Sequence, residues 1–313
     1  MGGDSYGRDV YASSSSASWG ASSTSATRLT NNSLDPTMDP KSRKLISASE
    51  HPIVIMLDVT GSNIDFARLV YDKMPMFYGE IEQRGYLDDF DIAICAVGDA
   101  YSDTYPLQVA EFARGIEIDS WLEKLVLEGN GGGQRQESYE LAAYYLLEQL
   151  EVGSGATPIV FFIADEAPYD RVNEYQAKQF GIPYSEPIDP FPGLRAKFHD
   201  NVFCFLNKYC GREWVSNITE AWMSRLAHEH VIKIQEEKSI VDLMLGVLAM
   251  IGGTRLESYA LDMAKRSQTP LRISGVRSAL EGVSTELVPV KRMATDLKAS
   301  GLPARTSNKG TRL

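Results

Sequence analysis

The sequence has few of the residues on which covalent, redox or zinc chemistry depends. Its 313 residues include three cysteines and four histidines. Cys95 and Cys204 lie inside apolar runs, so we expect reduced, buried thiols, and no spacing of Cys and His fits a zinc site. No His stands beside a Ser or Cys in a nucleophile context, and the G-x-S-x-G and Walker motifs are absent. We therefore expect no enzyme activity.

Long apolar runs are also missing. The most apolar segment, Ile240–Ile251, carries an Asp and stops after 12 residues at two glycines, which favours a buried helix over a membrane span. The first ten residues, MGGDSYGRDV, contain neither a basic start nor an apolar stretch. We expect a cytoplasmic protein that makes no contact with a membrane.

Charge is unevenly distributed along the chain. The formal net charge is -11, yet residues 265–313 hold ten Lys or Arg against Glu281, Glu286 and Asp296, a net of +7 that leaves -18 for residues 1–264. An acidic body makes nonspecific nucleic-acid binding by the domain unexpected. The basic end could bind an acidic partner, an RNA or the protein's own body.

Composition divides the chain into three parts. Residues 1–48 are rich in Ser and lack a period of 2 or 3.6, which predicts a disordered N-terminal tail. Residues 49–265 alternate between strand and helix patterns and should form one domain. For residues 266–313 we predict a basic, flexible C-terminal tail.

Within the domain, apolar runs predict strands at 53–57, 90–97, 159–164, 201–206 and 230–234. Helical patterns lie between them, at 63–85, 119–128, 137–150, 213–228 and 239–250. Strands that are apolar throughout and alternate with helices predict an α/β fold with a doubly wound, mainly parallel sheet. Residues 105–112 could add one short antiparallel edge strand after a tight link.

Polar residues follow two of the predicted strands, at the sheet edge where open parallel sheets bind ligands. Asp58, Thr60 and Ser62 follow the first strand, and Asp165 and Glu166 follow the third. With the amide of Gln134 in a Gly-rich turn they form an all-oxygen set, which suits Mg²⁺, Mn²⁺ or Ca²⁺. The alternative is that Asp58, Ser62 and Asp165 only cap helices.

The stretch LDVTGSN resembles the Asp-x-Ser/Thr-x-Ser signature of the von Willebrand factor A (vWA) domain, which opens its metal-ion-dependent adhesion site. VGDAYSDTYPLQVAEF, GGGQRQESYELAAYYL and FFIADEAPYD resemble later segments of that family's intracellular, protein-kinase-associated branch, in the same order. The resemblance implies a Rossmann-like vWA fold over roughly residues 50–255.

The same resemblance implies roles for individual residues. Asp58, Thr60 and Ser62 would be the first metal ligands, Asp165 a later one that binds through water, and Gln134 the third-position ligand, where the family has Thr or Asp. Glu137 matches the branch's Glu or is a helix N-terminal acid. In such domains the metal binds an acidic residue of a partner protein, and cytoplasmic relatives work beside an AAA+ ATPase or in a larger machine. We therefore expect an adaptor or assembly subunit.

A haloacid-dehalogenase-like, Mg²⁺-dependent phosphoester hydrolase is the alternative. DVTGS resembles the start of that family's Asp-x-Asp-Gly-Thr motif, and GDAYSD, Gly98 to Asp103, resembles its later acidic motif. Thr60, however, stands where the chemistry needs a general acid, and a Thr hydroxyl cannot protonate a leaving group in that way.

Overall fold

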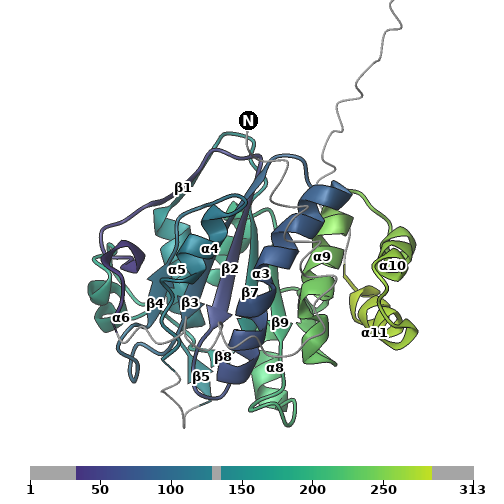
Figure 1. Ribbon diagram of the computed structural model, residues 1–313. Helices are drawn as coiled ribbons and strands as arrows, with labels where there is room; N and C mark the ends of the chain where they lie inside the picture. The colour runs from purple at the N-terminus through teal and green to yellow at the C-terminus, as the bar shows by residue number, and fades with distance from the viewer. Residues whose placement is uncertain (1–32, 129–134, 284–313) are drawn as a thin grey trace, which may run out of the picture.

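A six-stranded sheet runs through the centre of the molecule (Figure 1). The computed structural model describes residues 33–128 and 135–283. The strand order is β10-β9-β7-β2-β3-β4, and all neighbours are parallel except β3 and β4. The strands are β2 (His51–Asp58), β3 (Phe90–Val97), β4 (Leu107–Val109), β7 (Ile159–Ala164), β9 (Val202–Leu206) and β10 (Val231–Lys233). The predicted α/β class, mainly parallel with a short antiparallel edge strand, is confirmed.

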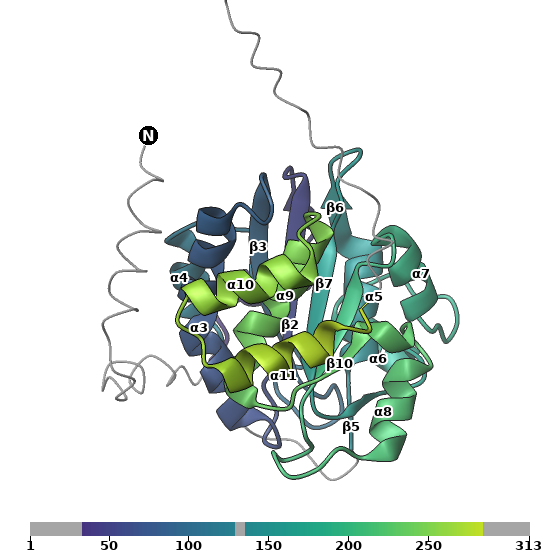
Figure 2. The same cartoon turned by 90° about the vertical axis from the view of Figure 1, so that its right-hand side faces the viewer.

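Helices cover both faces of this sheet, as a doubly wound fold requires (Figures 1 and 2). They are α3 (Ile64–Arg84), α4 (Glu117–Leu122), α5 (Tyr139–Gln149), α6 (Glu174–Gln179), α7 (Phe191–Lys197), α8 (Ser216–Met223), α9 (Ile240–Ile251), α10 (Leu256–Lys265) and α11 (Pro270–Leu280). Short 3-10 helices lie at Pro36–Met38, His228–His230 and Glu237–Ser239. Two small parallel pairs complete the fold: β1 (Leu45–Ser47) with β6 (Leu150–Val152), and β5 (Gln136–Glu137) with β8 (Ala167–Pro168).

The burial of the central strand β2 explains why residues 53–57 are apolar without interruption. All eight residues of the strand are buried, and the side chains of these five alternate between two clusters. Ile53, Ile55 and Leu57 belong to the cluster under α3 and α9, while Val54 and Met56 belong to the cluster under α5, α7 and α8. Burying one such side chain contributes about 1.5–3 kcal/mol, so both faces of the strand stabilise its central position.

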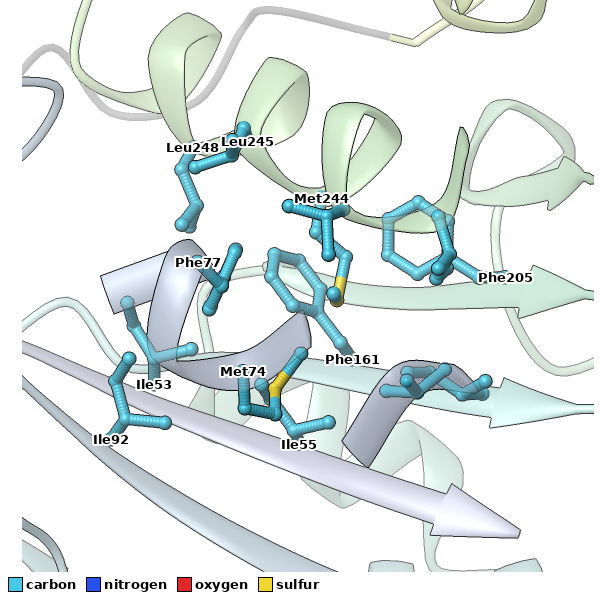
Figure 3. Packing of buried hydrophobic residues seen from close by; sticks show 14 of the residues in the cluster. Ile53, Ile55, Met74, Phe77, Ile92, Phe161, Phe205, Met244, Leu245 and Leu248 are labelled. Carbon is cyan, nitrogen blue, oxygen red and sulfur yellow. The ribbon is translucent and has the colours of Figure 1, made fainter. Parts of the chain in front are cut away.

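Figure 3 shows how the first of these clusters is packed. Side chains of α3 and α9 meet those of β2, β3, β7 and β9, namely Met74, Phe77, Met244, Leu245, Leu248, Ile53, Ile55, Ile92, Phe161 and Phe205. The helix α3 ends at Gly85, whose φ of 60° is the left-handed conformation that glycine adopts most readily. The packing fixes α3 over β2, and so fixes the turn that joins them.

The predicted domain boundaries at residues 49 and 265 are too narrow. On the N-terminal side, β1 pairs with β6, and Met38 and Leu45 are fully buried. On the C-terminal side, α11 packs Val276 and Leu280 into the core. These segments place only a few apolar residues in the core, which explains why no period was visible in the sequence. Of the predicted tails, 1–48 and 266–313, the parts at residues 1–32 and 284–313 lie outside the described residues.

A buried group of charges fixes α10 to the rest of the fold. Arg266, just after α10, donates to Asp242 of α9 over 2.8 Å, and its Nε lies 3.7 Å from the Glu80 carboxylate of α3. All three side chains are at most 5% exposed. Glu80 also accepts a hydrogen bond from Arg84. Charges buried this deeply are tolerated because each has a partner.

None of the helices in the described part of the chain is long and apolar enough to cross a membrane.

Candidate metal centre

The polar residues predicted to form a site meet where the central strands end. β2 and β7 pair in parallel from Ile53 opposite Ile159 to Leu57 opposite Ile163, so Asp58 and Asp165 leave the sheet at the same edge. The small pair β5 and β8 lies at this edge as well (Figure 1). Asp58 is fully buried and Asp165 is 1% exposed.

Two hydroxyl groups lie between these carboxylates. The Thr60 hydroxyl donates to Asp58 Oδ1 over 2.6 Å, and the Ser62 hydroxyl donates to Asp165 Oδ1 over 3.1 Å. The two hydroxyl oxygens are 3.4 Å apart. Since each proton is directed to its own carboxylate, both oxygens keep lone pairs free beside one another.

Asp58 is itself held in place by further hydrogen bonds. Its Oδ1 also accepts the backbone N–H of Thr60 over 2.8 Å, and its Oδ2 accepts the Tyr139 hydroxyl over 2.5 Å. Tyr139 is the first residue of α5 and is fully buried against Trp222. No signal in the sequence marks Tyr139 as part of the site. Both oxygens of Asp58 are therefore occupied by donors from the protein itself.

Asp165 is satisfied in the same way. Besides Ser62, it accepts the backbone N–H of Cys210 at Oδ2 over 3.2 Å. The capping alternative is wrong for the first loop, because the N-cap of α3 is Asn63 and neither Asp58 nor Ser62 caps it. These side chains are bonded to each other instead of to the start of the helix.

Two glutamates beside this group are buried without comparable partners. Glu166 is fully buried, and both of its carboxylate oxygens lack a hydrogen-bond partner among the described residues. Glu137 is 1% exposed, and its Oε2 is likewise unpartnered in residues 33–128 and 135–283. Glu137 lies in β5, opposite Pro168, and precedes α5, so it is not a residue of that helix.

Burial and mutual repulsion raise the pKa values of these carboxyl groups. Desolvation and the charge of Asp58 raise the pKa of Glu166 to about 7. The same two causes raise the pKa of Glu137 and of Asp165 far above the ordinary range. Desolvation raises the pKa of Asp58 too, against the hydrogen bonds from Thr60 and Tyr139. Protons or a cation would relieve this accumulation of negative charge.

The donor set fits a small divalent cation that prefers oxygen. Neighbouring oxygens around Mg²⁺ lie about 3 Å apart, close to the separation of the two hydroxyl oxygens. Within the described ranges, no three Asp, Glu, His or Cys side chains converge closely enough to hold a metal by themselves. A cation here would need the hydroxyls of Thr60 and Ser62. Gln134, the predicted third-position ligand, lies outside the described residues.

The acidic turn that resembled a hydrolase motif has a structural role. Asp103 accepts the backbone N–H of Asp99 over 2.6 Å, and a Cβ on Gly98 would lie 2.4 Å from Asp103 Oδ2. Asp99 in turn accepts hydrogen bonds from Ser102 and from the Tyr169 hydroxyl. The sequence GDAYSD thus forms a compact turn in which Gly98 makes room for the carboxylate of Asp103.

No protein-family model matches the sequence, and no curated protein matches it either. Among solved structures, the pilus adhesin SpaC from Lactobacillus rhamnosus GG, in its open conformation, is similar with a TM-score of 0.45 and 12% identity, over 67% of this chain and 31% of its own. Proximal thread matrix protein 1 from the mussel byssus, with a zinc-occupied MIDAS motif, is similar with a TM-score of 0.42 and 12% identity. That similarity covers 66% of this chain and 48% of the mussel protein. This chain spans less than half the length of either, and likeness at this level supports no conclusion about function.

Proposed function

We propose that this protein is a binding module that captures a partner protein through a divalent cation, Mg²⁺ being the expected ion. The observation that carries the proposal is the pair of hydroxyl oxygens of Thr60 and Ser62. Thr60 donates to Asp58 and Ser62 donates to Asp165, and the two hydroxyl oxygens adjoin a group of buried carboxylates. The four segments that resemble the vWA family, in the family's order, support the same function.

A bound cation would supply a positive charge that can coordinate a carboxylate from outside the chain. We therefore propose that the partner offers an acidic residue, and that an AAA+ ATPase or another subunit of a larger cytoplasmic machine is a suitable candidate. The acidic body of the chain makes nucleic acid a poorer partner for the domain. For the basic residues of segment 284–313 we propose a second contact, with RNA or with an acidic protein surface.

Binding is favoured over phosphoester hydrolysis by the surroundings of Asp58. A nucleophilic carboxylate must reach its substrate, whereas Asp58 is fully buried and both of its oxygens accept hydrogen bonds from Thr60 or Tyr139. A phosphatase assay with Mg²⁺ and a generic ester separates the two functions. Turnover that disappears in Asp58→Asn would overturn the binding proposal.

The direct test removes one hydroxyl and keeps the shape of its side chain. Thr60→Val should weaken Mg²⁺ binding in calorimetric titration by at least about tenfold, because the cation loses a ligand. It should also abolish capture of the partner in Mg²⁺, as EDTA should in the wild type. Thr219→Val is a matched control, since the buried Thr219 hydroxyl has no hydrogen-bond partner among the described residues. Equal Mg²⁺ affinity in both variants would contradict the proposal.

A further inference from the structure

Glu137 and Glu166 have buried carboxylate oxygens that accept no hydrogen bond from the described residues. Glu166 is fully buried with both oxygens unpartnered, and Glu137 is 1% exposed with Oε2 unpartnered, in residues 33–128 and 135–283. Buried polar groups without hydrogen bonds are rare in folded proteins, and a buried charged group without a partner is strongly destabilising. These oxygens therefore call for a ligand.

The carboxylates of Asp58 and Asp165, in contrast, accept hydrogen bonds at both of their oxygens. Asp58 accepts from Thr60 at one oxygen and from Tyr139 at the other. Asp165 accepts from Ser62 at one oxygen and from the backbone of Cys210 at the other. A cation that approached either aspartate directly would have to compete with two donors.

The fold holds Glu166 next to Ser62 and holds Glu137 beside Glu166. Glu166 directly follows Asp165, and its backbone carbonyl is fixed by the indole N–H of Trp222 over 2.8 Å. The β5–β8 pairing places Glu137 opposite Pro168, two residues beyond Glu166. Ser62 and Glu137 lie near enough to Glu166 to act on its carboxylate, and the charge of Glu166 acts on Glu137. Glu166 thus adjoins Ser62 of the hydroxyl pair, and Glu137 lies beside Glu166.

We propose that Glu166 and Glu137 are direct ligands of the divalent cation, together with the hydroxyls of Thr60 and Ser62, whereas Asp58 and Asp165 act only by orienting those hydroxyls. The inference rests on the cation of the proposed function and assigns its ligands. Two carboxylates balance the charge of one divalent ion. They also supply the negative charge that the neutral amide of Gln134 does not.

The first experiment is a calorimetric titration of the 313-residue chain with Mg²⁺. Glu166→Gln and Glu137→Gln should each lower the affinity by at least about tenfold. Glu140→Gln is the matched control: Glu140 is also fully buried, but its oxygens accept from Gln176 and from the backbone N–H of Tyr169. The control should keep wild-type affinity within about twofold.

A second experiment separates a direct ligand from a nearby charge. Glu166→Cys should lose Mg²⁺ affinity and bind Cd²⁺ more tightly than the wild type, because a thiolate prefers the softer ion. Only a side chain in contact with the cation can change its preference in this way. The wild type, which retains Cys210 beside the site, provides the Cd²⁺ baseline.

The outcomes separate this inference from the proposed function. Wild-type Mg²⁺ affinity in both Gln variants, or no gain of Cd²⁺ affinity in Glu166→Cys, would overturn the ligand assignment and leave the binding module intact. Absence of Mg²⁺ binding in the wild type would overturn both. Each Gln variant replaces a buried carboxyl group that has an unpartnered oxygen with an amide of the same shape, so it should fold by circular dichroism. An unfolded variant would show that the carboxyl group has a structural partner and would overturn the inference.

Discussion

The direction of two hydroxyl protons organises the candidate site at the scale of single residues. Thr60 and Ser62 donate to Asp58 and Asp165, which leaves their oxygens open. Tyr139 fixes the other side of Asp58 with a hydrogen bond of 2.5 Å. Each aspartate therefore acts as an acceptor that sets the orientation of a neighbouring hydroxyl, and the hydroxyls form the surface that a cation would meet.

Tyr139→Phe should affect both stability and cation binding. The variant leaves one oxygen of a buried carboxylate without its donor, so we expect the free energy of unfolding to fall by about 2 kcal/mol. Mg²⁺ affinity should fall about tenfold, because Asp58 loses a group that orients it. Denaturant titration and calorimetry measure the two effects.

Tyr145→Phe provides the control for that variant. Tyr145 lies on the same helix, is fully buried, and donates its hydroxyl to the backbone carbonyl of Arg43 over 3.0 Å. Its loss should cost about 1 kcal/mol of stability and leave Mg²⁺ affinity unchanged. If both variants bound Mg²⁺ alike, Tyr139 would have no role in the site.

The sequence predicted part of this residue-level picture. The spacing of Asp58, Thr60 and Ser62 after an apolar strand, with Asp165 after another, was sufficient to predict that they meet, because parallel strands end at one edge. The roles within the group were not predictable. Which oxygen receives which proton depends on Tyr139 and Cys210, which are 81 and 45 residues distant from their partners along the chain.

At the scale of elements, the strands were easier to predict than the ends of the domain. Central strands such as β2 are buried on both faces, so the interior of the strand, Ile53 to Leu57 in β2, is apolar at every position. The helix α11 has two buried residues, Val276 and Leu280, which are too few to produce a recognisable amphipathic pattern. The strand β1 is three residues long and alternates buried and exposed positions only once. Short elements carry too little periodicity to be recognised.

The attachment of α10 depends on Arg266, and its removal should destabilise the protein strongly. Arg266→Ala leaves Asp242 without its charged partner and deprives Glu80 of one, inside the core. Breaking a buried pair in this way costs about 3–5 kcal/mol. The free energy of unfolding from urea titration measures the loss.

Arg255→Ala is the matched exposed substitution. Arg255 is 84% exposed and lies 3.7 Å from Glu257, so its loss should change stability by less than about 0.5 kcal/mol. A comparable loss in both variants would mean that the buried charges do not fix α10.

At the scale of the whole molecule, Mg²⁺ should stabilise the fold, and more so at higher pH. The pKa of Glu166 is about 7 in the metal-free fold, against an ordinary value of 4.5. The folded chain therefore binds more protons than the unfolded chain between these values. The stability of the metal-free protein should fall as pH rises through this window, and the contribution of Glu166 to that fall should be complete above pH 7.

Thermal unfolding in EDTA and in Mg²⁺, at pH 5.5 and pH 8, tests this expectation. Protons compete with the cation at the lower pH, so the Mg²⁺-induced rise in melting temperature should be larger at pH 8. At a concentration of 100 times Kd the gain is about 2.7 kcal/mol. Glu166→Gln should reduce the pH dependence in EDTA. A Mg²⁺ effect of equal size at both pH values would contradict the expectation.

The position of β2 between β3 and β7 also has a kinetic consequence. β3 follows β2 after a single helix, whereas β7 begins about a hundred residues later, so the contact of Ser62 with Asp165 spans 103 residues. Contacts of such large sequence separation form late, because closing the intervening loop loses entropy first. The cation site is therefore complete only after the sheet has closed. A cation bound there would slow unfolding without accelerating folding, so it would increase the kinetic stability of the native state.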